Sequence, residues 1–173
     1  MPQPKYARES MTIMTEMVLP NDTNTLNNLM GGRLLHFMDI AAAIAAQKHS
    51  NRIVVTASVD NVSFSEPIRL GNIVTMKAQV TRAFSSSMEV FIDVWAEDIP
   101  AGIRVSTNNA YYTFVAVDQS GRPIEVPAVL PETDDEKERY VSALRRRQLR
   151  LVLAGRMKPE DAKELREFLQ IND

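Results

Sequence analysis

One acidic residue, Asp39, lies in the middle of a mostly apolar stretch, residues 34–46. A carboxylate in dry surroundings is costly unless it is paired or takes part in a reaction. Such a group can act as a general base on water, or it can attack a carbonyl carbon and form an anhydride, and both routes stay open here. The alternative is a structural aspartate satisfied by a neighbouring hydroxyl or backbone N–H. Because the stretch is so apolar, we favour a catalytic role.

Two glycines, Gly31 and Gly32, stand just before this stretch and follow a run of turn-forming residues, 21–28. This order predicts a buried helix that begins near Gly31 and extends to His49. Unpaired N–H groups and a partial positive charge mark a helix start, and glycines let a ligand approach them closely. The N–H groups of Gly32 and Arg33 are therefore candidates for holding a developing oxyanion. The alternative is a glycine pair that serves tight helix packing.

The spacing between these two features carries an inference of its own. Gly32 and Asp39 are seven residues apart, which is about 10 Å of helix rise. One reacting carbonyl cannot lie about 3 Å from both groups of the same chain. If both act together, they come from different subunits, and two-fold symmetry gives two such sites per dimer. Asn24 would then lie on the same half of the site as Gly32 and face the partner subunit's Asp39, unless it is a simple turn or cap residue.

Strands are expected to surround the helix. Alternating apolar and polar residues predict half-buried strands, and β-branched residues support the others. The expected strands cover residues 10–19 (an edge strand ended by Pro20), 52–64, 72–82, 87–97 and 104–117. We expect an α+β fold in which a curved antiparallel sheet wraps around the central buried helix, with residues 1–9 as a frayed arm.

The C-terminal part has a different pattern. Acidic residues come first and basic residues last from Glu132 to Arg150, as in a helix that matches its dipole. Gly155 breaks this helix, and an amphipathic helix with Leu165, Phe168 and Leu169 on one face begins near Pro159. We therefore expect one domain over residues 1–131 and a helical extension over 132–173.

Composition excludes several kinds of site. The net charge is −2, which gives no electrostatic reason to bind nucleic acid. The chain has no cysteine and two histidines, so we expect no disulfide and no metal site. No signal peptide and no membrane-spanning stretch is evident, and we expect a cytoplasmic protein. We assign His36 to packing or an interface, and His49 to a favourable interaction with the helix dipole.

Five separated blocks together resemble the hotdog-fold acyl-CoA thioesterases, the bacterial and cytosolic acyl-CoA hydrolases. They are DTN at 22–24, GGRLLHFMDIAAAIAA at 31–46, VVTASVDNVSF at 54–64, SSMEV at 86–90 and FVAVDQSGRP at 114–123. The resemblance covers about residues 10–131 and leaves out the C-terminal tail. The order of the blocks makes it specific, since a single block would be weak.

The resemblance implies hydrolysis of an acyl-CoA thioester to CoA and a carboxylic acid, with no cofactor beyond the CoA of the substrate. It implies a homodimer, commonly a trimer of dimers. Asp39 matches the catalytic carboxylate, Asn24 the active-site asparagine, and Gly31 and Gly32 the helix start that receives the carbonyl. The residues that match possible CoA contacts are Thr56, Ser58, Ser86 and Ser87.

Two other functions remain as alternatives. The first is a hotdog acyl-CoA-binding sensor without turnover, which would need an effector module. The second is a hotdog dehydratase, whose chemistry depends on a histidine, whereas the helix carries Asp39 at its centre.

Overall fold

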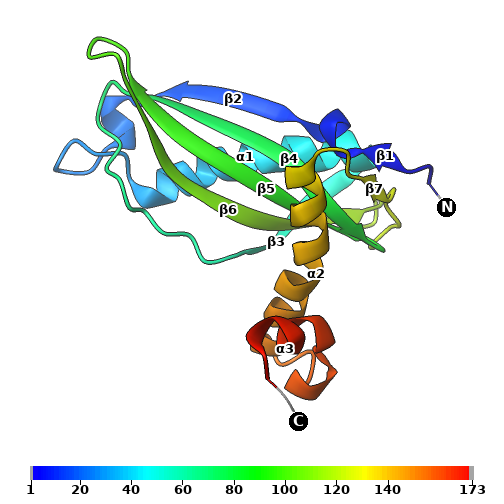
Figure 1. Ribbon diagram of the computed structural model, residues 1–173. Helices are drawn as coiled ribbons and strands as arrows, with labels where there is room; N and C mark the ends of the chain where they lie inside the picture. Colours follow the sequence, from blue (N-terminus) through cyan, green and yellow to red (C-terminus); the bar gives the residue numbers. More distant parts are fainter. Residues whose placement is uncertain (1, 172–173) are drawn as a thin grey trace. The chain divides into compact units, whose positions relative to one another are not determined.

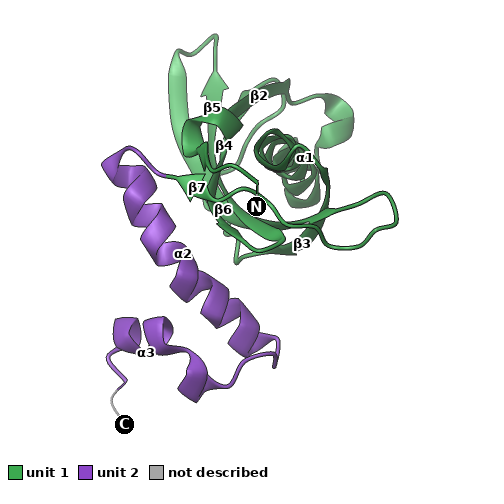
Figure 2. Ribbon diagram, turned by 90° about the vertical axis from the view of Figure 1, so that its right-hand side faces the viewer, with its two compact units in different colours: residues 1–130 green, residues 131–173 purple. Residues whose placement is uncertain are grey.

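The computed structural model describes residues 2–171, which divide into two compact units, one up to Leu130 and one from Pro131 on (Figure 2). Each unit is described by itself below. A domain boundary after residue 131 stays a prediction, because compactness does not show that either part folds independently.

The first unit is a five-stranded antiparallel sheet curled around one helix, α1 (Gly31–Ser50) (Figures 1 and 2). The strands occur in the spatial order β2-β4-β5-β6-β3. Their bounds are β2 Thr12–Met17, β3 Ile53–Val59, β4 Ile73–Phe84, β5 Ser87–Asp98 and β6 Ile103–Val117. The predicted hotdog architecture is confirmed, with β2 at the predicted edge.

The core lies between the concave face of the sheet and α1. Alternate residues of β4 and β5, such as Met76 and Ile92, are fully buried there, as the period of two in the sequence predicts. Small residues of the helix, such as Ala41 and Ala45, are also fully buried. Because alanine has only a Cβ, the helix backbone can lie close to the sheet.

Burial of α1 is one-sided within a single chain. Leu34, Phe37 and Met38 are buried, whereas His36 is exposed and Ile40 is 37% exposed. The expectation of a helix buried all round therefore holds for only one face of the isolated chain.

The N-terminal segment is not the frayed arm that we expected. Lys5–Tyr6 forms a short strand, β1, that pairs in parallel with β7 (Val129–Leu130). A 3₁₀ turn over Ala7–Ser10 then leads into β2. The strand expected over residues 52–64 is also shorter, because β3 ends at Val59 and a loop follows.

The second unit contains α2 (Asp134–Leu153), a 3₁₀ turn (Pro159–Asp161) and α3 (Lys163–Leu169). Thr133 caps α2 in a capping box with Glu136. The Arg145 guanidinium lies over the Phe168 ring at 4.2 Å, which ties α3 to α2. Within residues 2–171 no helix has the length and apolarity needed to cross a membrane.

Candidate active site

The carboxylate of Asp39 meets a hydroxyl of the neighbouring strand. Thr56 on β3 donates from Oγ1 to Asp39 Oδ1 at 2.7 Å. Asp39 is half-buried, beside the exposed face of α1. The hydroxyl partner considered as the structural alternative is therefore present, but it binds only one carboxylate oxygen. Oδ2 remains for a further donor such as water. Thr56, matched above to a CoA contact, is placed against the carboxylate.

A buried tyrosine supports the helical turn that leads to Asp39. Tyr112 on β6 donates its hydroxyl to the backbone carbonyl of Leu35 at 3.1 Å. Burial raises the pKa of Tyr112 to about 12, and the charge of Asp39 contributes to this shift. Sequence analysis missed this residue, because one tyrosine in an alternating strand gives no sign of which helix carbonyl it will meet.

The start of α1 offers free backbone donors. The N-cap residue Met30 provides no side-chain cap, and the N–H groups of Gly31 and Gly32 have no hydrogen-bond partner within residues 2–171. The space beside Gly32 is open, since a Cβ placed there would meet no atom within 4 Å. The N–H of Arg33, in contrast, donates to Met30 O at 3.0 Å. The N–H of Arg33 therefore has a partner in the first turn, which Gly31 and Gly32 lack, and its role as an oxyanion donor stays a prediction.

The loop before α1 is folded around Asn24. Its Oδ1 accepts from the N–H groups of Leu26 at 3.0 Å and Asn28 at 3.2 Å. The turn role considered above is thus real. The same two hydrogen bonds also fix the orientation of the Asn24 side-chain amide. Because both backbone donors bind Oδ1, Nδ2 is the end that faces outward. Asn24 is exposed, so Nδ2 is accessible.

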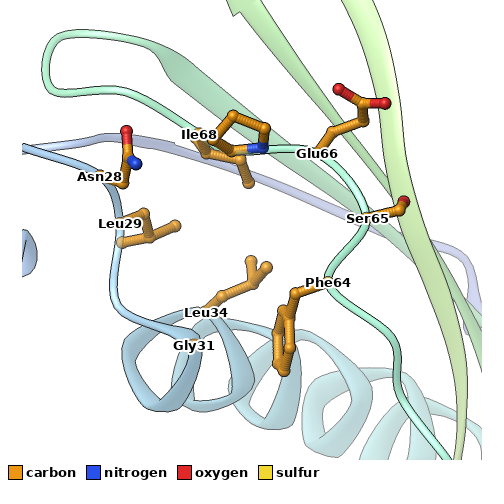
Figure 3. Close-up of a pocket in the computed structure, with 9 residues that line it drawn as sticks. Asn28, Leu29, Gly31, Leu34, Phe64, Ser65, Glu66 and Ile68 are labelled. Carbon is orange, nitrogen blue, oxygen red and sulfur yellow. The ribbon is translucent and has the colours of Figure 1, made fainter. Parts of the chain in front are cut away.

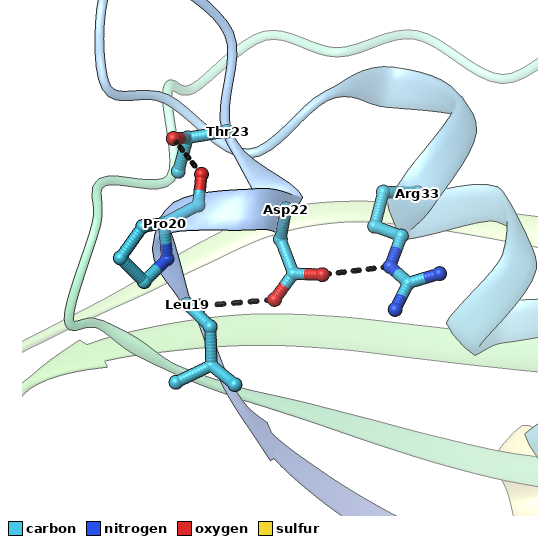
Figure 4. Close-up of polar contacts among 5 residues, drawn as sticks. All are labelled: Leu19, Pro20, Asp22, Thr23 and Arg33. Carbon is cyan, nitrogen blue, oxygen red and sulfur yellow. Dashed lines mark hydrogen bonds and ion pairs between the residues drawn. The ribbon is translucent and has the colours of Figure 1, made fainter.

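An ion pair joins this loop to the helix start (Figure 4). The Arg33 Nε lies 2.7 Å from Asp22 Oδ1, and Asp22 Oδ2 accepts from the N–H of Leu19 at 2.9 Å. Asp22 is 3% exposed. The Leu19 N–H and the Arg33 guanidinium lower the pKa of Asp22. We call Asp22 and Arg33 the loop clasp, which sequence analysis missed.

The two groups of candidate residues lie apart within one chain. Asn24 belongs to the loop before α1 and Gly32 to the start of α1, whereas Asp39, with Thr56 of β3 against it, lies two helical turns further along. Ser58 is on β3 near the second group. Ser87 pairs with Val115 and Val115 with Val55, so Ser86 and Ser87 lie two strands from β3, about 10 Å away. The structure brings Asp39 and Thr56 into contact and leaves the helix start separate.

His49, which we expected to interact favourably with the helix dipole, is a buried residue at the end of α1. Its ring is fully buried, with Nε2 2.7 Å from the carbonyl of Pro127. Burial lowers the pKa of His49, so the neutral ring is favoured. Among the described side chains, no group of three His, Cys, Asp or Glu residues is arranged to hold a metal ion.

Comparison with known proteins places the chain among hydrolases. Residues 26–103 match the thioesterase superfamily. YkhA of Bacillus subtilis, an uncharacterized acyl-CoA thioester hydrolase, is 40% identical over 145 residues, which are 84% of each chain. An apo-hexameric acyl-CoA thioesterase superposes with a TM-score of 0.85 and 40% identity, over 88% of this chain and 98% of the other.

A second solved structure adds a ligand. It is an acyl-CoA hydrolase from Staphylococcus aureus in complex with butyryl-CoA, CoA and CoA disulfide, with a TM-score of 0.81 and 37% identity over 98% of this chain and 99% of the other. Variants of that hydrolase with one aspartate, one asparagine or one threonine replaced by alanine have also been solved. The superfamily match, the shared fold and the 40% identity to YkhA all agree, and the chain belongs to the acyl-CoA thioester hydrolases of the thioesterase superfamily.

Proposed function

We propose that this protein hydrolyses an acyl-CoA thioester to CoA and a carboxylic acid, in a site built from two copies of the chain. The observation that carries the proposal is the pair of unused N–H groups at the uncapped start of α1, together with a supported carboxylate two turns away. Thioester hydrolysis needs both parts, one to hold the oxyanion and one to activate the nucleophile.

The oxyanion is held by the N–H of Gly32, with the N–H of Gly31 beside it. Both donors are already in place before the reaction, so no reorganisation is needed as charge develops on the carbonyl oxygen. The helix dipole adds to the effect, since the first turn of α1 contains no acidic residue.

Asp39 either activates the nucleophile or is the nucleophile. In one route its free Oδ2 takes a proton from water while the water oxygen attacks the thioester carbon. In the other, Oδ2 attacks that carbon and water hydrolyses the anhydride. Either way the CoA thiolate leaves and takes up a proton. Thr56 positions the carboxylate through Oδ1. The outward Nδ2 of Asn24 donates to the water or to the thioester.

Two copies are needed because about 10 Å of helix separates Gly32 from Asp39. The exposed side of α1, which includes Ile40, is suited to meet a second copy. β3 is the last strand of the sheet and carries the exposed apolar residues Ile53, Val55 and Val59. An apolar edge strand of this kind favours pairing with another chain. We propose a dimer across this region, with Asn24 and Gly32 facing the partner subunit's Asp39, assembled into a trimer of dimers.

The Staphylococcus aureus variants support this choice of residues. The replaced asparagine, aspartate and threonine of that hydrolase follow one another in the same order and at the same two sequence spacings as Asn24, Asp39 and Thr56. CoA contacts by Ser58, Ser86 and Ser87 remain part of the proposal. Ser58 lies on β3 close to Thr56, whereas Ser86 and Ser87 lie at the start of the central strand, β5, two strands from β3.

The test is release of free CoA thiol from butyryl-CoA by wild type, Asp39→Ala and the matched control Asp93→Ala. Asp93 is half-buried but faces the opposite side of the sheet from α1, since its neighbours Ile92 and Val94 are in the core. We expect Asp39→Ala to lose at least about 100-fold in kcat while it still binds CoA, and Asp93→Ala to remain active. CoA binding without thiol release by wild type would instead indicate a sensor.

A further inference from the structure

A hollow of about 330 Å³ lies beside the start of α1. Three segments form it, namely the end of the Asn24 loop, the first turn of α1, and residues 64–68. Figure 3 shows the side chains of Leu29, Leu34, Phe64 and Ile68 around it. Leu34 and Ile68 are buried, so the inner wall is apolar.

Backbone hydrogen bonds keep the walls of the hollow together. The N–H of Leu29 donates to the carbonyl of Ile68 at 2.7 Å, and the N–H of Leu70 donates to that of Asn27 at 2.9 Å. The hollow is therefore formed before any ligand binds, as ligand pockets usually are.

The position of the hollow connects it to the reaction. Gly31 lines it, and the next residue is Gly32, whose N–H is free. Consecutive Cα atoms are 3.8 Å apart, so a carbonyl held at Gly32 brings the first carbons of its chain to the mouth of the hollow. We propose that this hollow is the acyl chamber of the enzyme and that Phe64, packed against Gly31, sets the length of chain it accepts.

Phe64 limits the chamber because its ring is close to the helix backbone. A Cβ added at Gly31 would lie 3.3 Å from Phe64 Cζ, so glycine is what leaves room for the ring. Phe64 is 51% exposed, so its ring is not part of the buried core. Its removal enlarges the chamber without opening the buried core.

The lining determines the class of acyl group. A methylene takes about the volume of a water molecule, roughly 30 Å³, so the chamber holds a chain of about ten carbons. None of the nine lining residues carries a positive charge, and one, Glu66, is acidic. A chain that ends in a carboxylate would be desolvated there without a partner. The substrates are therefore short and medium-chain, uncharged aliphatic acyl-CoAs.

This inference rests on the proposed thioesterase activity, and kcat/KM for a panel of acyl-CoAs from two to sixteen carbons tests it. With wild type we expect about a fourfold gain per methylene up to about ten carbons and no gain beyond. Succinyl-CoA should react at least about ten times more slowly than butyryl-CoA, which has the same number of carbons. Phe64→Ala should move the optimum to chains about three carbons longer.

The control is Phe168→Ala, which removes another exposed phenylalanine (59% exposed) from the second unit and should leave the length profile unchanged. Ratios between chain lengths are taken within each variant, so a partly unfolded preparation does not alter them. An unchanged profile in Phe64→Ala, or a wild-type profile that is flat or still rising at sixteen carbons, would overturn the chamber assignment. Absence of thiol release from every acyl-CoA would instead overturn the proposed function.

Discussion

Asp22→Asn is the change that examines the loop clasp most sharply, because it keeps the shape of the side chain and removes its charge. Asp22 binds Arg33 Nε with one oxygen and the N–H of Leu19 with the other. An asparagine keeps one of these acceptors and turns an N–H₂ group toward the other donor. Arg33, which is 42% exposed, can then turn to solvent.

The magnitude follows from what is lost. Removing one partner of a fully buried ion pair costs about 3–5 kcal/mol, but solvent around Arg33 screens this pair. We expect Asp22→Asn to lose about one charge-assisted hydrogen bond, which lowers the free energy of unfolding by ~2 kcal/mol. For a chain of 173 residues this lowers Tm by about 4–8 °C. Since the loop carries Asn24, we also expect kcat to fall about tenfold or more with little change in KM.

The assay is urea unfolding of wild type, Asp22→Asn, Arg33→Gln and the double variant, with kcat measured in parallel. If the pair is coupled, the free energy of unfolding of the double variant is little lower than that of Asp22→Asn alone. The folded pKa of Asp22 is lowered, so its contribution is present above the unfolded value of 3.8 and is lost as pH falls through the folded pKa. The difference between wild type and Asp22→Asn should therefore shrink below about pH 4. If the losses of unfolding free energy in the two single variants simply add in the double variant, or if kcat is unchanged in Asp22→Asn, the loop clasp is refuted.

Three further outcomes are expected. Thr56→Val should lower kcat about tenfold because Asp39 loses its hydroxyl partner, and Thr56→Ser should restore most of it; equal rates for the two variants would argue against positioning. Ile40→Lys should give a folded but inactive monomer by analytical ultracentrifugation, and an active monomer would contradict the shared site. The pKa of His49 is lowered in the folded state, so the unfolded state takes up the proton at a higher pH than the folded state does. The urea midpoint should therefore fall as pH drops below about 6.5, and His49→Gln should remove this dependence.

Regular local patterns were enough to predict most elements. Strict alternation over Val74–Val80 and Met88–Ala96 gave strands because side chains on a pleated strand alternate between faces, and both segments are strands. The turn residues and glycines before the apolar stretch gave the start of α1 at Gly31. These features depend on residues close in sequence, which is why a single sequence reveals them.

Features that depend on distant residues were missed. The pairing of Lys5–Tyr6 with Val129–Leu130 joins two segments too short to show any period. The burial of His49 under Pro127 is equally non-local. The Asp22–Arg33 pair had a weak signal, an acidic turn residue followed by a basic residue at a helix start, but charge alone does not show whether a pair is buried.

Within the candidate site, spacing gave more information than residue type. The spacing of seven positions from Gly32 to Asp39 already indicated two separate half-sites, and α1 is continuous across them. The sequence did not show that the N–H of Arg33 has a partner inside the first turn, whereas those of Gly31 and Gly32 do not. Only the fold shows that the hydroxyl of Thr56 reaches Asp39, since the two residues lie on different elements.

Mixing two inactive variants tests the shared site most directly. Asp39→Ala and Asn24→Ala subunits are denatured together in equal amounts, refolded, and assayed for thiol release from butyryl-CoA. Half of the random dimers are mixed, and each mixed dimer has one site with both groups intact, so about a quarter of the wild-type activity should return. If Asn24 and Asp39 of the same chain work together instead, no intact site can form. Activity no higher than that of the two variants assayed separately would contradict a site shared between subunits.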